Sequence, residues 1–156
     1  MLRSRTGDVV FLFDVDNTLL DNDRFSAALD ARLTQVLGAE GRKRYRQWYE
    51  TLRDERGYAD YLEPLQRIRQ PFVADSALLQ LSTFVLDFPF AGLVYPGALD
   101  ALAATARTGT TLILSDGDMV FQPRKIQRSG LWDAVEGRVL LTVHKQRTLD
   151  AVQQAC

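Results

Sequence analysis

An uninterrupted apolar run occupies residues 9–13 and stops at Asp14. Its β-branched and aromatic side chains, without polar alternation, are typical of a strand buried on both faces of a parallel sheet. Two more runs of similar character lie at residues 110–114 and 138–143. We therefore predict three parallel strands, each followed directly by polar residues.

Between the first two runs, apolar residues recur every three or four positions, which indicates amphipathic helices. Gly38 and Gly57 are placed to end the first two helices, and Asp75 to cap the start of the last one. The aromatic stripe on the second helix is more typical of a helix-bundle core than of a cofactor site. Four helices are predicted in this segment, at residues 23–37, 40–56, 58–69 and 75–86.

Strands that alternate with helices indicate an α/β fold with a parallel sheet. The helical segment after the first strand is too long for a simple crossover, so we predict an inserted four-helix cap. The expected core consists of residues 1–20 and 93–156, and the expected cap of residues 21–92. Further core helices are predicted at 98–108, at 123–129 and from residue 146 onward.

Polar side chains follow the predicted strands at their carboxyl ends, where ligand sites of parallel sheets gather. Asp14 and Asp16 follow the first strand, Ser115 the second and Lys145 the third. Asp14 is ionised at neutral pH and can attack phosphorus directly. Asp16, two positions on, can protonate the leaving oxygen and then deprotonate the water that hydrolyses the intermediate. These residues predict a phosphoryl-transfer site.

The phosphate of such a substrate needs hydrogen-bond donors and positive charge. Ser115 can donate to a phosphoryl oxygen, and Gly117 lets the backbone of Ser115-Asp116-Gly117 approach an anion closely. Lys145 supplies a compact positive charge. Mg²⁺ is the expected metal, with Asp14 and Asp16 as its protein ligands, because it prefers carboxylate, carbonyl and phosphate oxygens.

Each of these residues also has a purely structural interpretation. The paired aspartates can cap the turn that follows the strand, and Ser-Asp-Gly is a common turn sequence. His144 is interpreted as an ordinary loop histidine. Lys125 is the competitor of Lys145, but it lies within a predicted helix, so we assign it to the surface. The basic run at residues 42–46 is assigned to the solvated face of a helix.

Together these motifs resemble the haloacid dehalogenase-like hydrolase superfamily. Residues 11–20 match its first motif, a hydrophobic strand followed by Asp-x-Asp-x-Thr-Leu; residues 112–117 match the second motif and Lys145 the third. The helical insertion resembles a C1-type cap. The resemblance implies a Rossmann-like core, Mg²⁺, and Asp14 as nucleophile. It also implies Asp16 as acid/base with its main-chain carbonyl on the metal, and Ser115 and Lys145 on the phosphate.

Asp16 favours the phosphatase branch of that superfamily over the dehalogenase branch, which lacks the second acid. The expected function is therefore Mg²⁺-dependent hydrolysis of a small phosphorylated metabolite. The fourth motif, acidic residues that complete the metal site, would follow Lys145 by another helix and strand, whereas the sequence ends at Cys156. A truncated, nearly inactive member that binds a phosphorylated ligand or a protein is the alternative, and a dehalogenase is less favoured.

Composition limits the kinds of partner and the cellular compartment that are expected. The formal net charge of −1 gives no electrostatic reason to expect nucleic acid. The apolar stretch near the N-terminus is too short for a signal-peptide core or a membrane span. Cys156 is the single cysteine, so a reducing, cytoplasmic location is expected. In the resembling fold the first strand would be unpaired on one side here, so self-association through that strand is also expected.

Overall fold

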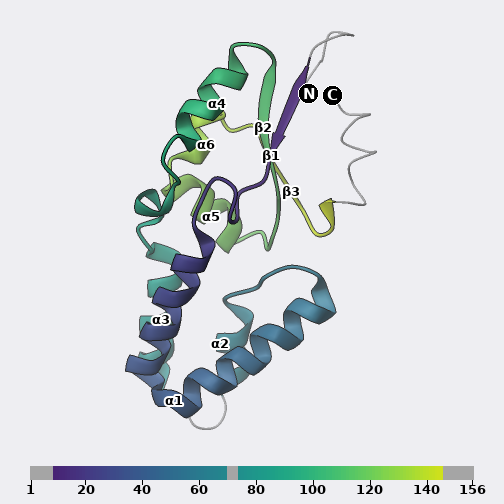
Figure 1. The fold of residues 1–156 in the computed structure, drawn as a ribbon. Coiled ribbons are helices and arrows are strands. Elements are labelled where there is room, and N and C mark those ends of the chain that lie inside the picture. Colours follow the sequence, from purple (N-terminus) through teal and green to yellow (C-terminus); the bar gives the residue numbers. More distant parts are fainter. Residues whose placement is uncertain (1–8, 70–73, 146–156) are drawn as a thin grey trace.

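The three predicted strands form one parallel sheet in the computed structural model, which describes residues 9–69 and 74–145. They are β1 (Val10–Phe13), β2 (Thr110–Asp116) and β3 (Val139–Thr142), in the order β1-β2-β3. The α/β class and the parallel pairing predicted from sequence are confirmed. The carboxyl ends of the strands point toward the helices of the cap (Figure 1).

Three core helices lie on one side of the sheet (Figure 1): α4 (Ala98–Ala106), α5 (Phe121–Arg128) and α6 (Leu131–Ala134). Helix α5 begins earlier than predicted because Asp118 Oδ1 accepts hydrogen bonds from the backbone N–H groups of Val120 and Phe121, both at 2.8 Å. This is the usual way in which an aspartate satisfies the first turn of a helix. Helix α6 was missed because four residues are too few for a periodic pattern.

The cap consists of α1 (Asn22–Arg56), α2 (Glu63–Ile68) and α3 (Asp75–Asp87), followed by the 3₁₀ helix η1 (Phe90–Leu93). The predicted break at Gly38 is a kink inside α1, where φ is 72° and ψ is 178°. The two halves of α1 are tied together by Arg46, whose Nε lies 2.7 Å from Asp30 Oδ1. None of the helices in the described ranges is both long enough and apolar enough to cross a membrane.

Two helix starts in the cap differ from the prediction. Helix α2 begins at Glu63 because Asp60 Oδ1 accepts hydrogen bonds from the backbone N–H groups of Leu62 and Glu63, which holds the preceding residues in a turn. The N-cap of α3 is Ala74, so the prediction of Asp75 was wrong by one position. Asp75 lies in the first turn instead, 3.4 Å from Arg69 Nε, where a carboxylate suits the helix dipole.

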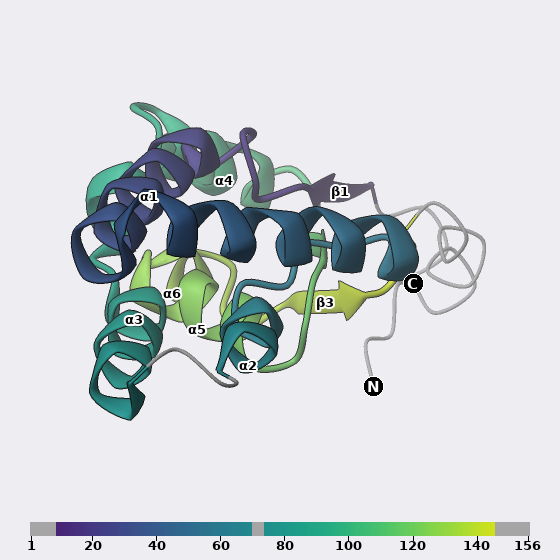
Figure 2. The same ribbon diagram turned by 90° about the horizontal axis from the view of Figure 1, so that it is seen from below.

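A cluster of aromatic rings joins the cap to the core. Phe25 of α1 stacks on Phe121 of α5 with ring centroids 5.6 Å apart, and Tyr61 lies 4.9 Å from the same ring. Phe88 and Phe90, in the segment that returns to the core, also contact Phe25. Rings at these distances and angles stabilise each other beyond simple burial. This cluster fixes α1 and α2 beside the carboxyl ends of the strands (Figures 1 and 2).

Strand β1 is less buried than predicted. Leu12 is 37% exposed and Val9, just before the strand, is 55% exposed. The reason is topological, because β1 pairs only with β2 among the described residues and forms the edge of the sheet there. The central strand β2 has five consecutive buried residues, as an uninterrupted apolar run predicts. The helix predicted from residue 146 onward lies outside the described residues.

Candidate active site

Asp14 and Lys145 meet at the carboxyl edge of the sheet. Asp14 directly follows β1 and Lys145 follows β3, and the parallel register brings both strand ends to the same edge. Lys145 Nζ lies 2.7 Å from Asp14 Oδ1. The two side chains are 30% and 35% exposed, so a solvent-borne ligand can reach the pair. A charged hydrogen bond of this length orients the carboxylate as well as offsetting its charge.

The turn after β1 determines the directions of the Asp14 and Asp16 side chains. Val15 is fully buried, and its carbonyl oxygen accepts hydrogen bonds from the N–H groups of residues 18–20. Asn17 adopts a left-handed conformation (φ 57°), which asparagine tolerates better than most residues. Its Oδ1 then accepts from the backbone N–H groups of Asn22 and Asp23, which fixes the start of α1. Asp14 and Asp16 therefore flank a residue anchored in the core.

Gln122 of α5 covers Ser115, and sequence analysis did not predict it. Its Nε2 donates a hydrogen bond of 2.8 Å to Ser115 Oγ and lies 3.5 Å from Asp16 Oδ2. Ser115 is 1% exposed. A Cβ on Gly117 would lie 2.8 Å from both Cβ and Cγ of Gln122, so this close approach requires glycine. Gln122 thus connects the ends of β1 and β2.

Asp116 is engaged in the loop that carries Lys145. Its Oδ1 accepts hydrogen bonds from Thr142 Oγ1 at 2.5 Å and from the backbone N–H of Lys145 at 2.8 Å. The N–H of Gly117 donates to the carbonyl oxygen of Thr142 at 3.2 Å. These contacts give Asp116 a positioning role for Lys145. Direct phosphate contacts of Asp116 and Gly117 remain predictions.

The assignment of Lys125 to the surface was wrong. Its side chain is fully buried, its Nζ forms an ion pair with Asp16 Oδ1, and it donates a second hydrogen bond of 3.2 Å to Asn22 Oδ1. Strand-end reasoning missed it because the residue comes from a helix. A signal was nevertheless present in the sequence, since Lys125 lies four positions after Phe121 and directly before Ile126, two apolar residues that are buried with it on α5.

Charges in the site are balanced pairwise, with one lysine on each predicted catalytic aspartate. Burial lowers the pKa of Lys125, while Asp16, and more weakly Asp14 and Asp118, act to raise it. Burial also raises the pKa of Tyr61 well above its usual value, so this phenol is neutral at physiological pH. A dianionic phosphoryl group would bring uncompensated negative charge to this site, which a divalent cation could offset.

The residues present fit part of a magnesium site. Within the described ranges, no group of three or more His, Cys, Asp or Glu residues is arranged to hold a metal. Mg²⁺, however, keeps several waters and often takes only one or two carboxylates besides substrate oxygens. The Asp14 carboxylate, one oxygen of which is bound by Lys145, and the main-chain carbonyl of Asp16 are the predicted ligands. The Asp16 carboxylate is engaged by Lys125 instead.

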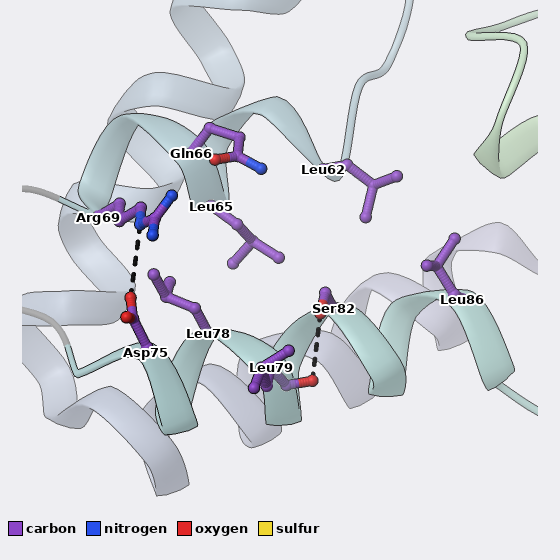
Figure 3. A pocket seen from close by; sticks show the side chains of 9 residues that line it. All are labelled: Leu62, Leu65, Gln66, Arg69, Asp75, Leu78, Leu79, Ser82 and Leu86. Atoms are coloured by element: carbon purple, nitrogen blue, oxygen red, sulfur yellow. Dashed lines mark hydrogen bonds and ion pairs between the residues drawn. The ribbon is translucent and has the colours of Figure 1, made fainter.

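An apolar pocket of about 510 Å³ lies elsewhere, between α2 and α3 of the cap (Figure 3). Five leucines line it, together with Gln66 and Ser82, and the Arg69–Asp75 ion pair stands at one end. None of the predicted site residues borders it. We therefore place the candidate chemistry at the sheet edge, where the charged groups converge, rather than in this pocket.

Three solved structures are similar to the chain to different degrees. A haloacid dehalogenase-like hydrolase from Burkholderia xenovorans LB400 is 58% identical, with a TM-score of 0.87, over 95% of this chain and 69% of that one. A haloacid dehalogenase-like family hydrolase from Xanthomonas campestris is 20% identical over 95% of this chain and 70% of that one, with a TM-score of 0.64. The magnesium-bound HAD-hydrolase YfnB from Bacillus subtilis is 19% identical over 85% and 62%, with a TM-score of 0.55.

The last two likenesses show the fold alone, because their identity is low. Searches against protein-family models and curated proteins found no match. The first likeness is much stronger, since 58% identity extends over nearly all of this chain and more than two thirds of the other. The chain belongs to the haloacid dehalogenase-like hydrolases.

Proposed function

We propose that the protein is a Mg²⁺-dependent phosphohydrolase that acts on a small phosphorylated metabolite through an aspartyl-phosphate on Asp14. The observation that carries this proposal is the second carboxylate. Asp16 is 30% exposed beside Asp14 and is held in place by Lys125. Attack on a carbon–halogen bond needs no acid for its halide leaving group, whereas an alkoxide leaving group does.

Asp14 is proposed as the nucleophile through its Oδ2. Because Lys145 Nζ binds Oδ1 at 2.7 Å, the other oxygen is the one left to attack phosphorus. The new O–P bond forms as the bond from phosphorus to the leaving oxygen breaks. Holding the carboxylate in one orientation reduces the entropic cost of this attack.

Asp16 is proposed to move the proton in both half-reactions. In the first, its protonated carboxyl group gives a proton to the leaving oxygen; in the second, the carboxylate takes a proton from the water that attacks phosphorus. The second step releases inorganic phosphate and regenerates the Asp14 carboxylate. Asp16 Oδ2 suits this role, since Oδ1 is the atom paired with Lys125.

Ser115 and Lys145 are proposed to hold the phosphoryl group. Ser115 Oγ accepts from Gln122, so its own hydroxyl proton is available to a phosphoryl oxygen. Mg²⁺ on Asp14 and the Asp16 carbonyl would offset the negative charge that gathers on the phosphoryl oxygens. The cap beside this edge is proposed to exclude water and select the substrate. Magnesium bound to the Bacillus subtilis relative is consistent with this metal.

Binding of a phosphorylated ligand without turnover is the second candidate. It is favoured by one observation, that the described residues lack a cluster of three metal-binding side chains. A dehalogenase is the third and less favoured candidate. As for location, we propose the reducing cytoplasm, because Cys156 is the single cysteine of the sequence.

Two assays test the proposal. The first measures phosphate release from an aryl phosphate across a Mg²⁺ titration, and the second measures halide release from a 2-haloacid. We expect magnesium-dependent phosphate release that Asp14→Asn reduces to background, because an amide is a far weaker nucleophile. Asp54→Asn, the same change at an exposed position of α1, should keep the rate. Halide release without phosphate release would assign the dehalogenase, and phosphate-analogue binding without either reaction would assign the second candidate.

The leaving group tests Asp16 separately. Asp16→Asn should slow an alkyl phosphate much more than an aryl phosphate, because aryl oxides leave without a proton. The aryl-to-alkyl rate ratio is therefore expected to rise by about one order of magnitude or more, within the usual contribution of general acid catalysis. Equal losses on both substrates would contradict the proton-transfer role.

A further inference from the structure

Four polar side chains connect the candidate acid/base to the cap. Lys125 Nζ binds both Asp16 Oδ1 and Asn22 Oδ1, and Asn22 Nδ2 donates a hydrogen bond of 3.1 Å to the hydroxyl oxygen of Tyr61. Asp16 and Lys125 belong to the core, Asn22 is the first residue of α1, and Tyr61 precedes α2 in the cap. The connection therefore crosses from core to cap through one asparagine.

The direction of these hydrogen bonds is fixed by chemistry. An ammonium group only donates, so the oxygen of the Asn22 amide must face Lys125. The amide nitrogen, which only donates, then faces Tyr61, whose oxygen accepts. Asn22 thus fits only when a donor lies on one side and an acceptor on the other, and leucine or alanine could not replace it in this role.

We propose that Lys125 is a positioning residue that holds the Asp16 carboxylate in its working orientation and, through Asn22, makes that orientation depend on the seating of Tyr61 in the cap. The catalytic part of this proposal rests on the proposed function. Lys125 is fully buried and its Nζ donates to two protein oxygens, so we assign it no substrate contact. Lys125 affects the reaction only through Asp16. It binds Oδ1 of that carboxylate, while Oδ2 lies on the side of Gln122.

Burial makes this lysine sensitive to its partners. A desolvated ammonium group is costly unless it is paired and hydrogen-bonded. Its partners among the described residues are Asp16, Asn22 and the ring of Phe121, whose centroid lies 5.3 Å from Nζ. Loss of either oxygen acceptor therefore leaves a buried charge poorly compensated, and the side chain is held tightly only when both are in place.

The cap end of the connection is equally well seated. Tyr61 is 2% exposed and packs against Phe25 and Phe121, with ring centroids 5.2 and 4.9 Å away. Its backbone carbonyl oxygen accepts a hydrogen bond of 2.8 Å from the hydroxyl group of Tyr45. A displacement of the cap that moves Tyr61 would remove the acceptor of Asn22 Nδ2. The Asn22 side chain, whose oxygen binds Lys125, would then be held less firmly.

Thermal melting of two variants, compared with the wild-type chain, tests the ion pair without any need for activity. Asp16→Asn leaves Lys125 as a buried charge without its counterion, so this variant should melt lowest. Asp16→Asn combined with Lys125→Met removes both charges and should melt higher than Asp16→Asn alone. A double variant that melts at or below Asp16→Asn would show that the two side chains are not paired in solution, and would overturn the proposal.

Hydrogen exchange tests the link to the cap, also without activity. Lys125→Met should speed exchange of backbone amides at the start of α1 and near Tyr61, whereas Lys43→Met, at an exposed position of α1, should leave them unchanged. Tyr61→Phe, which removes only the hydroxyl group, should likewise speed exchange at the start of α1. Unchanged exchange there in both Lys125→Met and Tyr61→Phe would break the proposed link.

The aryl-to-alkyl rate ratio is a measurement that a merely structural role of Lys125 would leave unchanged. Lys125→Met should raise the aryl-to-alkyl rate ratio several-fold, as Asp16→Asn does, and should add nothing to it in an Asp16→Asn background. Tyr61→Phe should raise the ratio less, and Thr111→Val, which removes a buried hydroxyl group near the amino end of β2, should leave it unchanged. Equal proportional losses of rate on aryl and alkyl phosphates would mean that Lys125 only stabilises the fold. If the wild-type chain releases no phosphate at all, the proposed function fails, while melting and exchange still decide the connection.

Discussion

Lys145 Nζ lies 2.7 Å from Asp14 Oδ1, although the two residues are 131 positions apart and follow the two outer strands of the described sheet. The contact therefore reaches across the end of β2, the strand that lies between them and carries Ser115. Asp116 supports this contact, because its Oδ1 accepts a hydrogen bond from the backbone N–H of Lys145. A phosphoryl group that reaches Asp14 therefore meets a lysine already in place.

Lys145→Met is expected to reduce phosphate release by two orders of magnitude or more, in line with the loss of one preorganised charge at a reacting centre. Aryl and alkyl phosphates should lose rate alike, because Lys145 contacts the nucleophile rather than the acid/base. Lys43→Met is the matched control at an exposed position of the cap and should keep the rate. A selective loss on alkyl phosphates would instead connect Lys145 to the leaving group.

The sequence identified the residues that lie at strand ends. Asp14, Ser115 and Lys145 were predicted because parallel strands deliver their carboxyl ends to one edge, and the Asp14–Lys145 contact follows that rule. Lys125 and Gln122 were not predicted, since helix residues reach a site only by the way their helix packs. That packing depends on the close approach at Gly117 and on the aromatic cluster around Phe121, which are tertiary features.

Dependence on tertiary packing also explains why the burial of β1 and the kink in α1 were not predicted. The run at residues 9–13 predicted a strand correctly, but its burial depended on which element covers it, and composition alone does not specify that. Gly38 was predicted as a helix end and is a kink, because its φ and ψ interrupt the helix while the chain resumes it immediately. Local patterns therefore determined element type, and long-range packing determined burial and connection.

Gly57 is expected to be intolerant of alanine because the cap contacts the core there. A Cβ at Gly57 would lie 2.3 Å from Cε1 of His144, the neighbour of Lys145. Its φ of 77° adds roughly 1 kcal/mol of backbone strain for alanine. Gly57→Ala should therefore lower the melting temperature and also reduce phosphate release, since displacement of His144 disturbs the loop that carries Lys145.

Gly130→Ala separates the two causes. Gly130 has a φ of 82°, and a Cβ there would meet nothing within 4 Å, so only the backbone strain applies. It should lower the melting temperature by less than Gly57→Ala and leave phosphate release unchanged. In a His144→Ala background, Gly57→Ala should cost no more than Gly130→Ala does. Equal effects of the two glycine substitutions in the wild-type background would show that the His144 contact does not hold in solution.

Asp87 is expected to make cap attachment dependent on pH. A hydrogen bond from Arg124, supported by Arg128, holds the pKa of Asp87 below its usual value. The two arginines also bind carbonyl oxygens at residues 86–88, so α5 holds the end of α3. A lowered pKa in the folded state contributes stability at pH values above the unfolded pKa, and this contribution is lost as the pH falls through the folded pKa.

Asp87→Asn should therefore lower the melting temperature slightly at neutral pH. The difference from wild type should shrink as the pH falls below about 4, the pKa of the unfolded chain, and vanish once the pH is below the lowered pKa of the folded state. The pair is exposed, so the difference should also shrink at high salt. Asp54→Asn, at an exposed position of α1, should show no such pH dependence. A difference that is the same at pH 3 and pH 7 would exclude the ion pair as its cause.

The chain is expected to self-associate through β1. This strand is the edge of the described sheet, with Leu12 37% exposed and Val9 55% exposed on or beside it. Apolar edge strands with unpaired backbone groups are templates for pairing with another chain. Sedimentation should show dimers or larger species whose proportion rises with protein concentration.

Leu12→Lys should shift that equilibrium toward monomer, because a charge on an exposed edge strand opposes pairing with a second copy. Leu99→Lys places the same charge at a residue of α4 that is 47% exposed, away from the edge, and should leave the equilibrium unchanged. Both variants change net charge equally, so general repulsion between copies is matched and only the location differs. Equal dissociation by the two lysines would mean that charge alone drives the effect. A wild-type chain that stays monomeric at every concentration would show that β1 is covered in solution.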